Sequence, residues 1–380
     1  MIDFELTEPQ KDLREALRAF AKSVISPGAA ERDENMSFPY DLIPKMAAMK
    51  LFGIAIPEKY GGAGLGTMEM AIVLEEIGQV DGAIALIVAS HNSLCTMHLH
   101  RFGTEAQRER YVVPLAKGEK LGAWALTEAG SGSDAASLQT TAVLDRDEWV
   151  INGNKLFTTQ GATAGIIVIM ASTAPGKGAS GISAFVVEKG TPGLSIGKPE
   201  NKLGVRASDT ASLHLENLRI PKENLVGLCN QGFQDVLQIL DGGRIGIGAM
   251  AVGLARGALE ASLLYAKERE QFGRPISDFQ AIQGKLSDMS SEIEAARLLV
   301  YYAAFLKDHG EDFKLAASEA KLFASEAAMR ACAQAIQIHG GTGYLKDAPV
   351  ERYFRDAKIC EIGEGTSEIQ RRVIAKEVLQ

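Results

Sequence analysis

The chain has 380 residues, of which 46% are hydrophobic and 23% charged, and its formal net charge is −8. This length allows two or three domains, and this composition is typical of a water-soluble globular protein. The negative charge is not gathered in an acidic block, so it argues against a nucleic-acid partner. No apolar run approaches the length of a bilayer-spanning segment, and we therefore expect no insertion into a membrane.

Cysteine and histidine spacing predicts neither a disulfide framework nor a metal site. The four cysteines are far apart and form no C-x-x-C pair, which is typical of free thiols in a reducing cytoplasm. His98 and His100 would point to different sides of a helix, so they are not expected to share a metal ion. Residues 1–5 are acidic and carry no secretory pattern, and we expect a protein of the bacterial cytoplasm.

Residues 1–120 are expected to be helical. Thr7 to Gln10 has the form of a capping box, and apolar residues follow at helical spacing from Leu13 to Ile25. A Gly-rich connector at residues 60–66 separates this helix from a second helical stretch that begins at Met68.

Residues 121–230 have the composition of β-strands. The Asn152-Gly153 pair lies between two β-prone runs and predicts a hairpin turn there. Three further strands, with turns that contain Gly or Pro between them, are expected at residues 166–170, 182–187 and 211–220.

From residue 231 onward the helical period returns in long segments rich in Ala, Leu, Glu, Lys and Arg. The three main helices are expected at residues 234–265, 279–307 and 313–338. The fold class is therefore multidomain α+β, in which a β domain lies between two helical domains. The expected domains are residues 1–120, 121–230 and 231–380.

Glu364 is the strongest candidate for a catalytic residue. Gly363 and Gly365 flank it, so a flat ligand could approach the backbone closely, and burial would raise the pKa of the carboxyl until it could act as a base. The alternative is a Gly-rich helix start, where Glu364 and Glu368 complement the helix dipole.

Four further segments combine polar residues with glycine. Small residues from Trp124 to Asp134 could present backbone N–H groups to a ligand, although the segment is not a G-x-G-x-x-G fingerprint. Asp241 and Arg244 would share one helix face, either to meet a polar ligand or as an ordinary ion pair. Residues 268–273 offer a forked arginine and an aromatic ring, and residues 337–344 form a helix end with a Gly-rich loop.

Six segments in this order resemble the FAD-dependent acyl-CoA dehydrogenase family over nearly the whole chain. They are LTEAGSGSD at 126–134, NGNKLFTTQG at 152–161, KLGVRASDT at 202–210, REQFGRPISDFQ at 269–280, QIHGGTGY at 337–344 and EGTSEIQR at 364–371. LDGGRIGI at 240–247 and SHNSLC at 90–95 are most similar to the short-chain, butyryl-CoA-type branch.

The resemblance implies an N-terminal helical domain, a central β-barrel or sandwich, and a C-terminal four-helix bundle, assembled as a homotetramer with one FAD per subunit. It places Glu364 at the catalytic base. It implies cofactor contacts for Trp124, Leu126, Thr127, Ser133, Phe157, Thr158, Thr159, Arg269, Gln271, Phe272, Gln280, Gln337, Gly340, Gly341, Thr366 and Glu368. It implies acyl-CoA contacts for Ser133, Asp241, Arg244, Gly363 and Gly365.

The reaction implied by the resemblance is α,β-dehydrogenation of an acyl-CoA. Glu364 would remove the α-proton, FAD would accept the β-hydride, and an electron-transfer flavoprotein would take the electrons. Gly363 stands where straight-chain members commonly carry tyrosine, which favours branched, cyclic or aryl acyl groups. Ala85 replaces a carboxylate-binding arginine of glutaryl-CoA dehydrogenases. The alternatives are an acyl-CoA oxidase, an enoyl-CoA reductase, or a non-catalytic flavin- or CoA-binding module.

Overall fold

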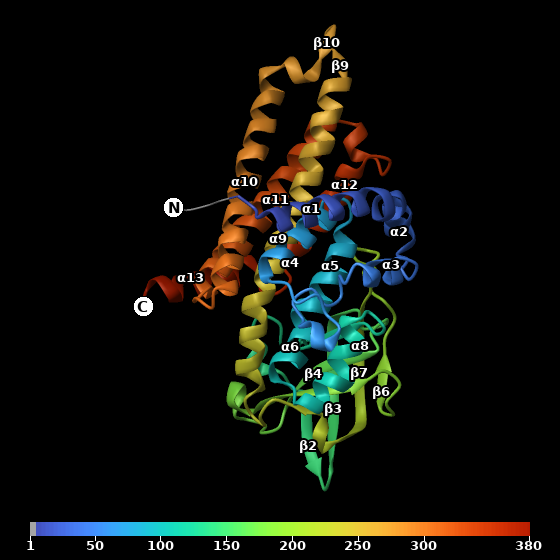
Figure 1. Ribbon diagram of the computed structural model, residues 1–380, viewed down its shortest axis with the longest axis vertical. Coiled ribbons are helices and arrows are strands. Elements are labelled where there is room, and N and C mark those ends of the chain that lie inside the picture. The colour runs from blue at the N-terminus through green and yellow to red at the C-terminus, as the bar shows by residue number, and fades with distance from the viewer. Residues whose placement is uncertain (1–4) are drawn as a thin grey trace.

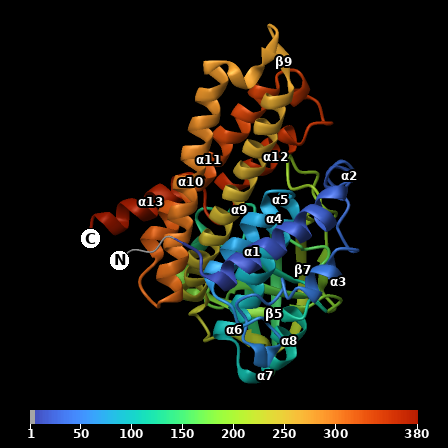
Figure 2. The same cartoon turned by 45° about the horizontal axis from the view of Figure 1, so that its top comes forward.

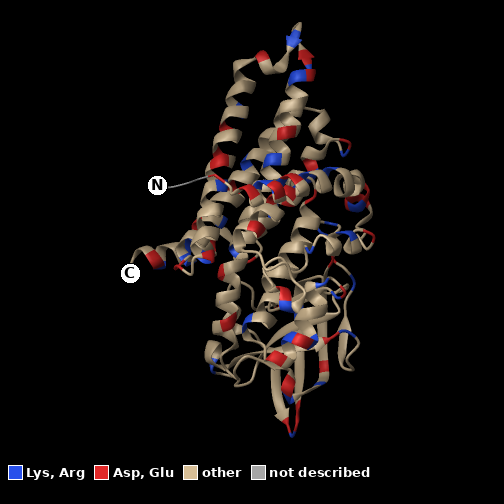
Figure 3. Cartoon of the chain, in the orientation of Figure 1, with Lys and Arg blue, Asp and Glu red and all other residues tan. Residues whose placement is uncertain are grey.

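The computed structural model describes residues 5–380, so the first four residues of the acidic N-terminus lie outside it. A helical part, a sheet and a second helical part follow one another along the chain (Figure 1). The sheet lies at one end of the molecule and the long C-terminal helices extend toward the other. Acidic and basic residues are interspersed over these parts (Figure 3).

The N-terminal part is helical, as predicted. Its helices are α1 (Glu8–Phe20), α2 (Ala29–Asn35), α3 (Ile43–Ala48), α4 (Thr67–Gly78), α5 (Gly82–Ser90), α6 (Met97–Phe102), α7 (Glu105–Gln107) and α8 (Val113–Ala116). The predicted capping contact at α1 is present, because Gln10 Oε1 accepts the backbone N–H of Thr7 at 3.1 Å. A π-helical turn, His91–Thr96, joins α5 to α6, and such turns are frequent at functional sites.

Two helical stretches are long and apolar enough, by composition, to cross a membrane. They are Gly82–Phe102 and Gly232–Glu268, and 83% and 67% of their most apolar windows are buried inside the protein. The expectation that no segment has this length and apolarity is therefore wrong. Both stretches pack against other helices, as core helices of a large protein do.

The central part is one eight-stranded sheet. Its strands are β1 (Gly122–Ala125), β2 (Thr141–Asp145), β3 (Glu148–Thr159), β4 (Ile166–Ser172), β5 (Ile182–Glu188), β6 (Leu194–Ile196), β7 (Thr210–Pro221) and β8 (Leu225–Val226). The order is β6-β7-β3-β2-β4-β5-β8, with β1 paired in parallel to β4. The strands predicted from residues 166, 182 and 211 onward are confirmed.

The hairpin predicted at Asn152-Gly153 is wrong. Strand β3 continues through this pair, and the chain instead reverses between Asp145 and Glu148. The pairing of β3 with β7 shifts register at Gly153, as in a β-bulge. A Cβ on Gly153 would lie 2.4 Å from Thr140 Oγ1, so the glycine permits a close packing contact, not a turn.

The C-terminal part holds three long helices close to the predicted positions. Its elements are α9 (Gly232–Glu268), β9 (Glu270–Gln271), β10 (Arg274–Pro275), α10 (Gln280–Asp308), α11 (Lys314–His339), α12 (Pro349–Ala357) and α13 (Ser367–Val378). Helix α9 packs against α10 and α11 and also against α4, so it belongs to both helical parts. The small β9–β10 hairpin forms the far tip, and α13 projects to the side (Figure 2).

Candidate active site

Glu364 lies in a turn before a helix, not within one. Its φ is +53° and that of Gly365 is +97°, so two successive residues have left-handed backbone. Thr366 is the N-cap of α13, and its hydroxyl accepts the N–H of Ile369 at 3.3 Å. Glu368 is in the first turn and suits the helix dipole, whereas Glu364 precedes the cap. The helix-start alternative therefore describes Glu368 and not Glu364.

The Gly242-Gly243 pair of α9 makes room for two charged side chains. A Cβ on Gly243 would lie 1.7 Å from Glu364 Oε2, so the carboxylate rests directly on the helix backbone. A Cβ on Gly242 would lie 2.7 Å from Lys307 Nζ. Glycine within a helix is unfavourable by about 1 kcal/mol relative to alanine. In the sequence the pair appears only as part of the LDGGRIGI segment, and two glycines in succession within a helix are the signal that could have indicated its role.

Burial dominates the electrostatics of Glu364. Within residues 5–380, its Oε2 atom is buried and has no hydrogen-bond partner. Burial raises the pKa of the carboxyl to about 7, against the opposing influence of Lys321, Arg244 and Lys307. A carboxyl group whose pKa is near neutrality, and whose oxygen has no hydrogen-bond partner, can accept a proton from a bound molecule.

Asp241 and Arg244 form the intrahelical ion pair that was one of their two interpretations. Arg244 Nη1 donates to Asp241 Oδ1 at 2.6 Å and to Ser318 Oγ on α11 at 3.1 Å. Burial raises the pKa of Asp241, against the opposing charge of Arg244. The pair lies on the part of α9 next to Glu364, and the charge of Arg244 acts on the carboxylates of both Asp241 and Glu364.

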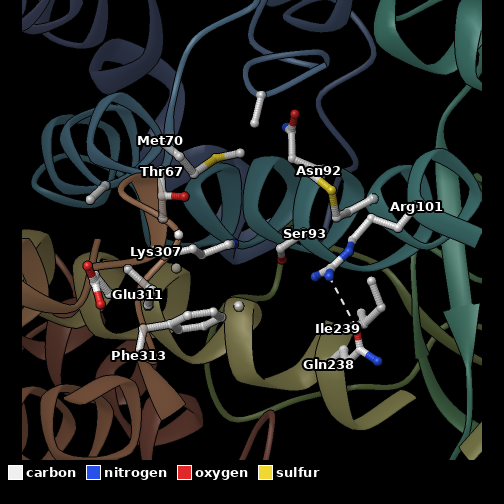
Figure 4. Close-up of a pocket in the computed structure, with 17 residues that line it drawn as sticks. Thr67, Met70, Asn92, Ser93, Arg101, Gln238, Ile239, Lys307, Glu311 and Phe313 are labelled. Atoms are coloured by element: carbon white, nitrogen blue, oxygen red, sulfur yellow. Dashed lines mark hydrogen bonds between the residues drawn. The ribbon is translucent and has the colours of Figure 1, made fainter. Parts of the chain in front are cut away.

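A pocket of about 440 Å³ borders this region (Figure 4). It lies between α4, the π-helical turn with α6, α9 and the α10–α11 connection. Lys307 and Arg101 enter it from opposite sides (Figure 4), while Met70, Ile239 and Phe313 supply apolar surface. Gly242 lines this pocket and the adjacent Gly243 contacts Glu364, so the pocket and the carboxylate use neighbouring positions of one helix.

The two segments expected near a flavin ring meet at the sheet. The N–H of Leu156 donates to Thr127 O at 2.8 Å, which joins residues 126–128 to β3. Trp124 Nε1 donates to His98 Nδ1 at 3.2 Å. Within residues 5–380, Thr158 Oγ1 is buried without a hydrogen-bond partner, while the neighbouring Phe157 is 67% exposed. An unpaired hydroxyl beside an exposed ring fits a planar cofactor with polar edges; Leu126 is buried and Thr159 half-buried in the same region.

A buried ion pair that sequence reasoning missed holds the same two segments together. Lys155 is fully buried in β3, and its Nζ donates to Glu128 Oε1 at 2.7 Å and to Leu126 O at 3.1 Å. The other oxygen of Glu128 accepts the N–H of Gln139 at 2.6 Å. The sequence signal that could have indicated this ion pair was a lysine within a strand whose residues alternate between apolar and polar. Beyond this anchored part, Ser133 lies in an exposed loop.

The remaining expected cofactor residues lie away from Glu364 within one chain. Arg269, Gln271, Phe272 and Gln280 surround the β9–β10 tip, and Phe272 is 93% exposed. Gln337, Gly340 and Gly341 lie at the end of α11, where His339 stacks on Tyr265 of α9 with ring centroids 4.3 Å apart. The structure thus brings these two segments to one end of the bundle, but not into the pocket beside Glu364.

Family comparisons match all three parts of the chain. The N-terminal domain of acyl-CoA dehydrogenases matches residues 7–119, the middle domain residues 123–218 and the C-terminal domain residues 230–379. The fold and the matched family domains define an FAD-dependent oxidoreductase. The chain belongs to the acyl-CoA dehydrogenase family.

Relatives match over the full length. "Probable acyl-CoA dehydrogenase YngJ" of Bacillus subtilis is 51% identical over 100% of both chains. "Acyl-CoA dehydrogenase, short-chain specific" of Clostridium acetobutylicum is 47% identical over 100% of both. "Acryloyl-CoA reductase (NADH)" of Anaerotignum propionicum is also 47% identical, over 100% of this chain and 96% of its own.

Solved structures agree with this assignment. Butyryl-CoA dehydrogenase of Megasphaera elsdenii is 41% identical, with a TM-score of 0.98 over 100% of both chains. A chain solved in work on the electron transferring flavoprotein of Acidaminococcus fermentans is 45% identical, again with a TM-score of 0.98 over 100% of both.

Proposed function

We propose that this enzyme dehydrogenates a short-chain, or a branched, cyclic or aryl-substituted, acyl-CoA to the 2-enoyl-CoA, with Glu364 as the base. The observation that carries this proposal is the unpaired, buried Oε2 of Glu364, whose pKa is raised to about 7. The α-proton of a thioester is weakly acidic, so a base with a raised pKa and no competing donor matches the task. Burial of the carboxyl supplies both properties.

The chain's own residues bind, orient and exclude water. The flavin ring would be held by Trp124, Leu126, Thr127 and residues 157–159. Thr366 and Glu368 would contact the dinucleotide near the base, and Ser133 would contact both the cofactor and the acyl-CoA. When bound, FAD supplies a hydride acceptor. The backbone N–H of Glu364 would donate to the thioester oxygen and stabilise the charge that develops there as the proton leaves. Asp241 and Arg244 would contact the CoA portion, next to the pocket that Lys307 and Arg101 enter.

The assembly and surroundings of the enzyme are part of the same proposal. Residues of the β9–β10 tip and of the α11 end would hold the adenine and pyrophosphate of FAD across a subunit interface in a homotetramer. The electrons would pass to an electron-transfer flavoprotein, in the cytoplasm of a bacterium. The domain boundaries at residues 120 and 230 are kept, since the limits of the three family domains fall close to them.

Gly363 is proposed to set the size of the acyl pocket. A Cβ at this position would have its nearest neighbour, Ile359 O, at 3.4 Å, so a larger side chain would have to enter the adjoining space. We expect Gly363→Tyr to lower kcat/KM for isobutyryl- or cyclohexanecarboxyl-CoA roughly ten-fold or more, and to spare butyryl-CoA. Steady-state kinetics with both classes measure this, and equal retention of activity on the bulky substrates would contradict the proposal.

Anaerobic visible spectroscopy of the holoenzyme tests the reaction. It is titrated with butyryl-, isobutyryl-, cyclohexanecarboxyl- and benzylsuccinyl-CoA. Bleaching of the flavin by one of them, and its loss in Glu364→Gln, supports the dehydrogenase. Purified protein that holds no flavin and takes up none would overturn the mechanism.

The relative named as an acryloyl-CoA reductase makes the reverse direction the second candidate. Reoxidation of chemically reduced holoenzyme by an enoyl-CoA, at a rate above that of reduction by the saturated partner, would favour the reductase. Oxygen consumption without another acceptor would identify an oxidase. A flavin that responds to none of these substrates would indicate either an acyl group outside the panel or the non-catalytic module.

A further inference from the structure

Two buried side chains hold the turn that carries Glu364. Gln370 of α13 is fully buried, and its Nε2 donates to Glu364 O at 3.2 Å and to Gly365 O at 3.0 Å. Lys321 of α11 is also fully buried, and its Nζ donates to Gly365 O at 2.7 Å. The carbonyls of both left-handed residues are therefore bound by side chains from two different helices.

The position of Lys321 has no evident purpose in packing alone. Burying an ammonium group is unfavourable unless an anion or several acceptors compensate it. Among residues 5–380, no carboxylate forms an ion pair with Lys321, and its Nζ donates instead to a single backbone carbonyl, that of Gly365. Burial lowers the pKa of Lys321 to about 8, although Cys360, Glu364 and Glu361 oppose this and Arg244 reinforces it. A methionine would fill the same space without the unfavourable free energy of burying a charge.

Left-handed backbone at a residue other than glycine is strained by roughly 1 kcal/mol or more and persists only where the surroundings enforce it. Glu364 is such a residue, and in this conformation its carboxylate lies against the backbone of Gly243. The donors that fix the two following peptide planes therefore fix the direction of the Glu364 side chain.

We propose that Lys321 and Gln370 are positioning residues, which hold the Glu364–Gly365 turn so that the Glu364 carboxylate lies on Gly243. The inference rests on the proposed role of Glu364 as base. Lys321 has a second effect, because its charge, with those of Arg244 on α9 and Lys307 on α10, faces the carboxylate and opposes the rise of its pKa. Gln370 is neutral and has the geometric effect alone, so the two variants differ in a measurable way.

The test compares Lys321→Met and Gln370→Leu in FAD-loaded, folded enzyme, by rapid-mixing measurement of flavin reduction from pH 5.5 to 9 with an acyl-CoA that bleaches the wild type. Both variants are expected to lower the limiting rate roughly ten- to hundred-fold, with little change in the substrate concentration for half-saturation. Only Lys321→Met should also move the acidic limb of the profile to higher pH, because it removes a cation beside the carboxylate.

Two further variants make these results specific. Lys321→Arg keeps the charge and the donors, so it should recover part of the lost rate. Arg330→Met, on the same helix as Lys321, removes an exposed ion pair with Glu292 of α10 and should leave rate and profile unchanged.

Wild-type rates and an unmoved acidic limb in Lys321→Met would overturn the proposal, as would identical profiles for Lys321→Met and Gln370→Leu. If Lys321→Met does not fold, Gln370→Asn draws the amide back by one methylene and decides the geometric part: a wild-type rate overturns it. Glu364→Gln is measured alongside. If that variant reduces flavin normally, the proposed function fails; if it is inactive while Lys321→Met is normal, only the positioning role fails.

Discussion

At the scale of single residues, the position of the Glu364 carboxylate depends on the absence of a side chain at Gly243 of α9. The carboxylate occupies the volume where any Cβ on Gly243 would lie, and its buried Oε2 has no hydrogen-bond partner within residues 5–380. A closely fitted base is sensitive to displacements of about 1 Å. The space on α9 is therefore as much a part of the site as the carboxylate.

Gly243→Ala should lower the limiting rate of flavin reduction by roughly a hundred-fold, because the new methyl group displaces the carboxylate. Gly284→Ala is the matched control, since this glycine of α10 has no atom within 4 Å of the added Cβ. The control should keep the rate and gain up to about 1 kcal/mol of stability from helix propensity. Equal rates in the two variants would show that the free space beside Gly243 has no catalytic role.

The raised pKa of Glu364 also predicts a dependence of stability on pH. The folded-state pKa of about 7 exceeds the ordinary value of 4.5, so the folded protein binds the proton more tightly than the unfolded chain does. Wild type should therefore lose stability as pH rises through this interval, and Glu364→Gln should not. Thermal unfolding of the two holoenzymes should show that the difference in stability between wild type and Glu364→Gln grows between about pH 5 and pH 7 and then levels off. A difference that stays constant with pH would contradict the raised pKa.

At the scale of elements, the Lys155–Glu128 ion pair joins the loop after β1 to β3. Both partners are buried, and the backbone of residues 126–128 is bonded to the same strand. A buried pair of this kind contributes little net stability, but removing one partner leaves the other charge uncompensated. The pair thus fixes the relative position of two segments that the proposed flavin site needs together.

Lys155→Met should lower the free energy of unfolding by roughly 3–5 kcal/mol and weaken retention of FAD. The double variant Lys155→Met/Glu128→Gln should recover part of the stability, because no buried charge is left unpaired. Lys222→Met removes an exposed ion pair with Asp147 and should change stability by about 1 kcal/mol or less. Denaturant unfolding and flavin content measure these effects; a Lys155→Met protein as stable as the Lys222→Met control would refute the argument.

At the scale of the whole molecule, one chain leaves part of its proposed cofactor site exposed. The β9–β10 tip stands at the far end of α9 and α10 (Figure 1), and Phe272 there is almost fully in solvent. Large exposed apolar groups often mark interaction surfaces. The proposed tetramer and the proposed FAD contacts would both cover this ring.

Phe272→Ser should therefore reduce FAD retention, the proportion of tetramer, or both, without moving the acidic limb that Glu364 sets. Light scattering with size-exclusion chromatography and flavin absorbance measure the two quantities. Tyr302→Ser, at an exposed aromatic position in the body of α10, is the control and should change neither. A variant at Phe272 with normal assembly and flavin content would remove the tip from the proposed site.

The sequence alone was enough to predict the order of the helical and strand regions, the extents of the long helices to within a few residues, and the segments that identify the family. These properties follow from local periodicity and from residues that lie close together in the chain. Local signals also misled: Asn152-Gly153 has the residues of a hairpin turn, but its glycine is needed for contact with Thr140. Only the tertiary structure decided such matters. Three features depend on contacts between segments that are distant in the chain. They are the space beside Gly243 that the Glu364 carboxylate fills, the hydrogen bonds from Lys321 and Gln370, and the Lys155–Glu128 pair. No local pattern encodes which side chain will occupy the space that another residue leaves free, because close packing is decided jointly by all the elements that meet there.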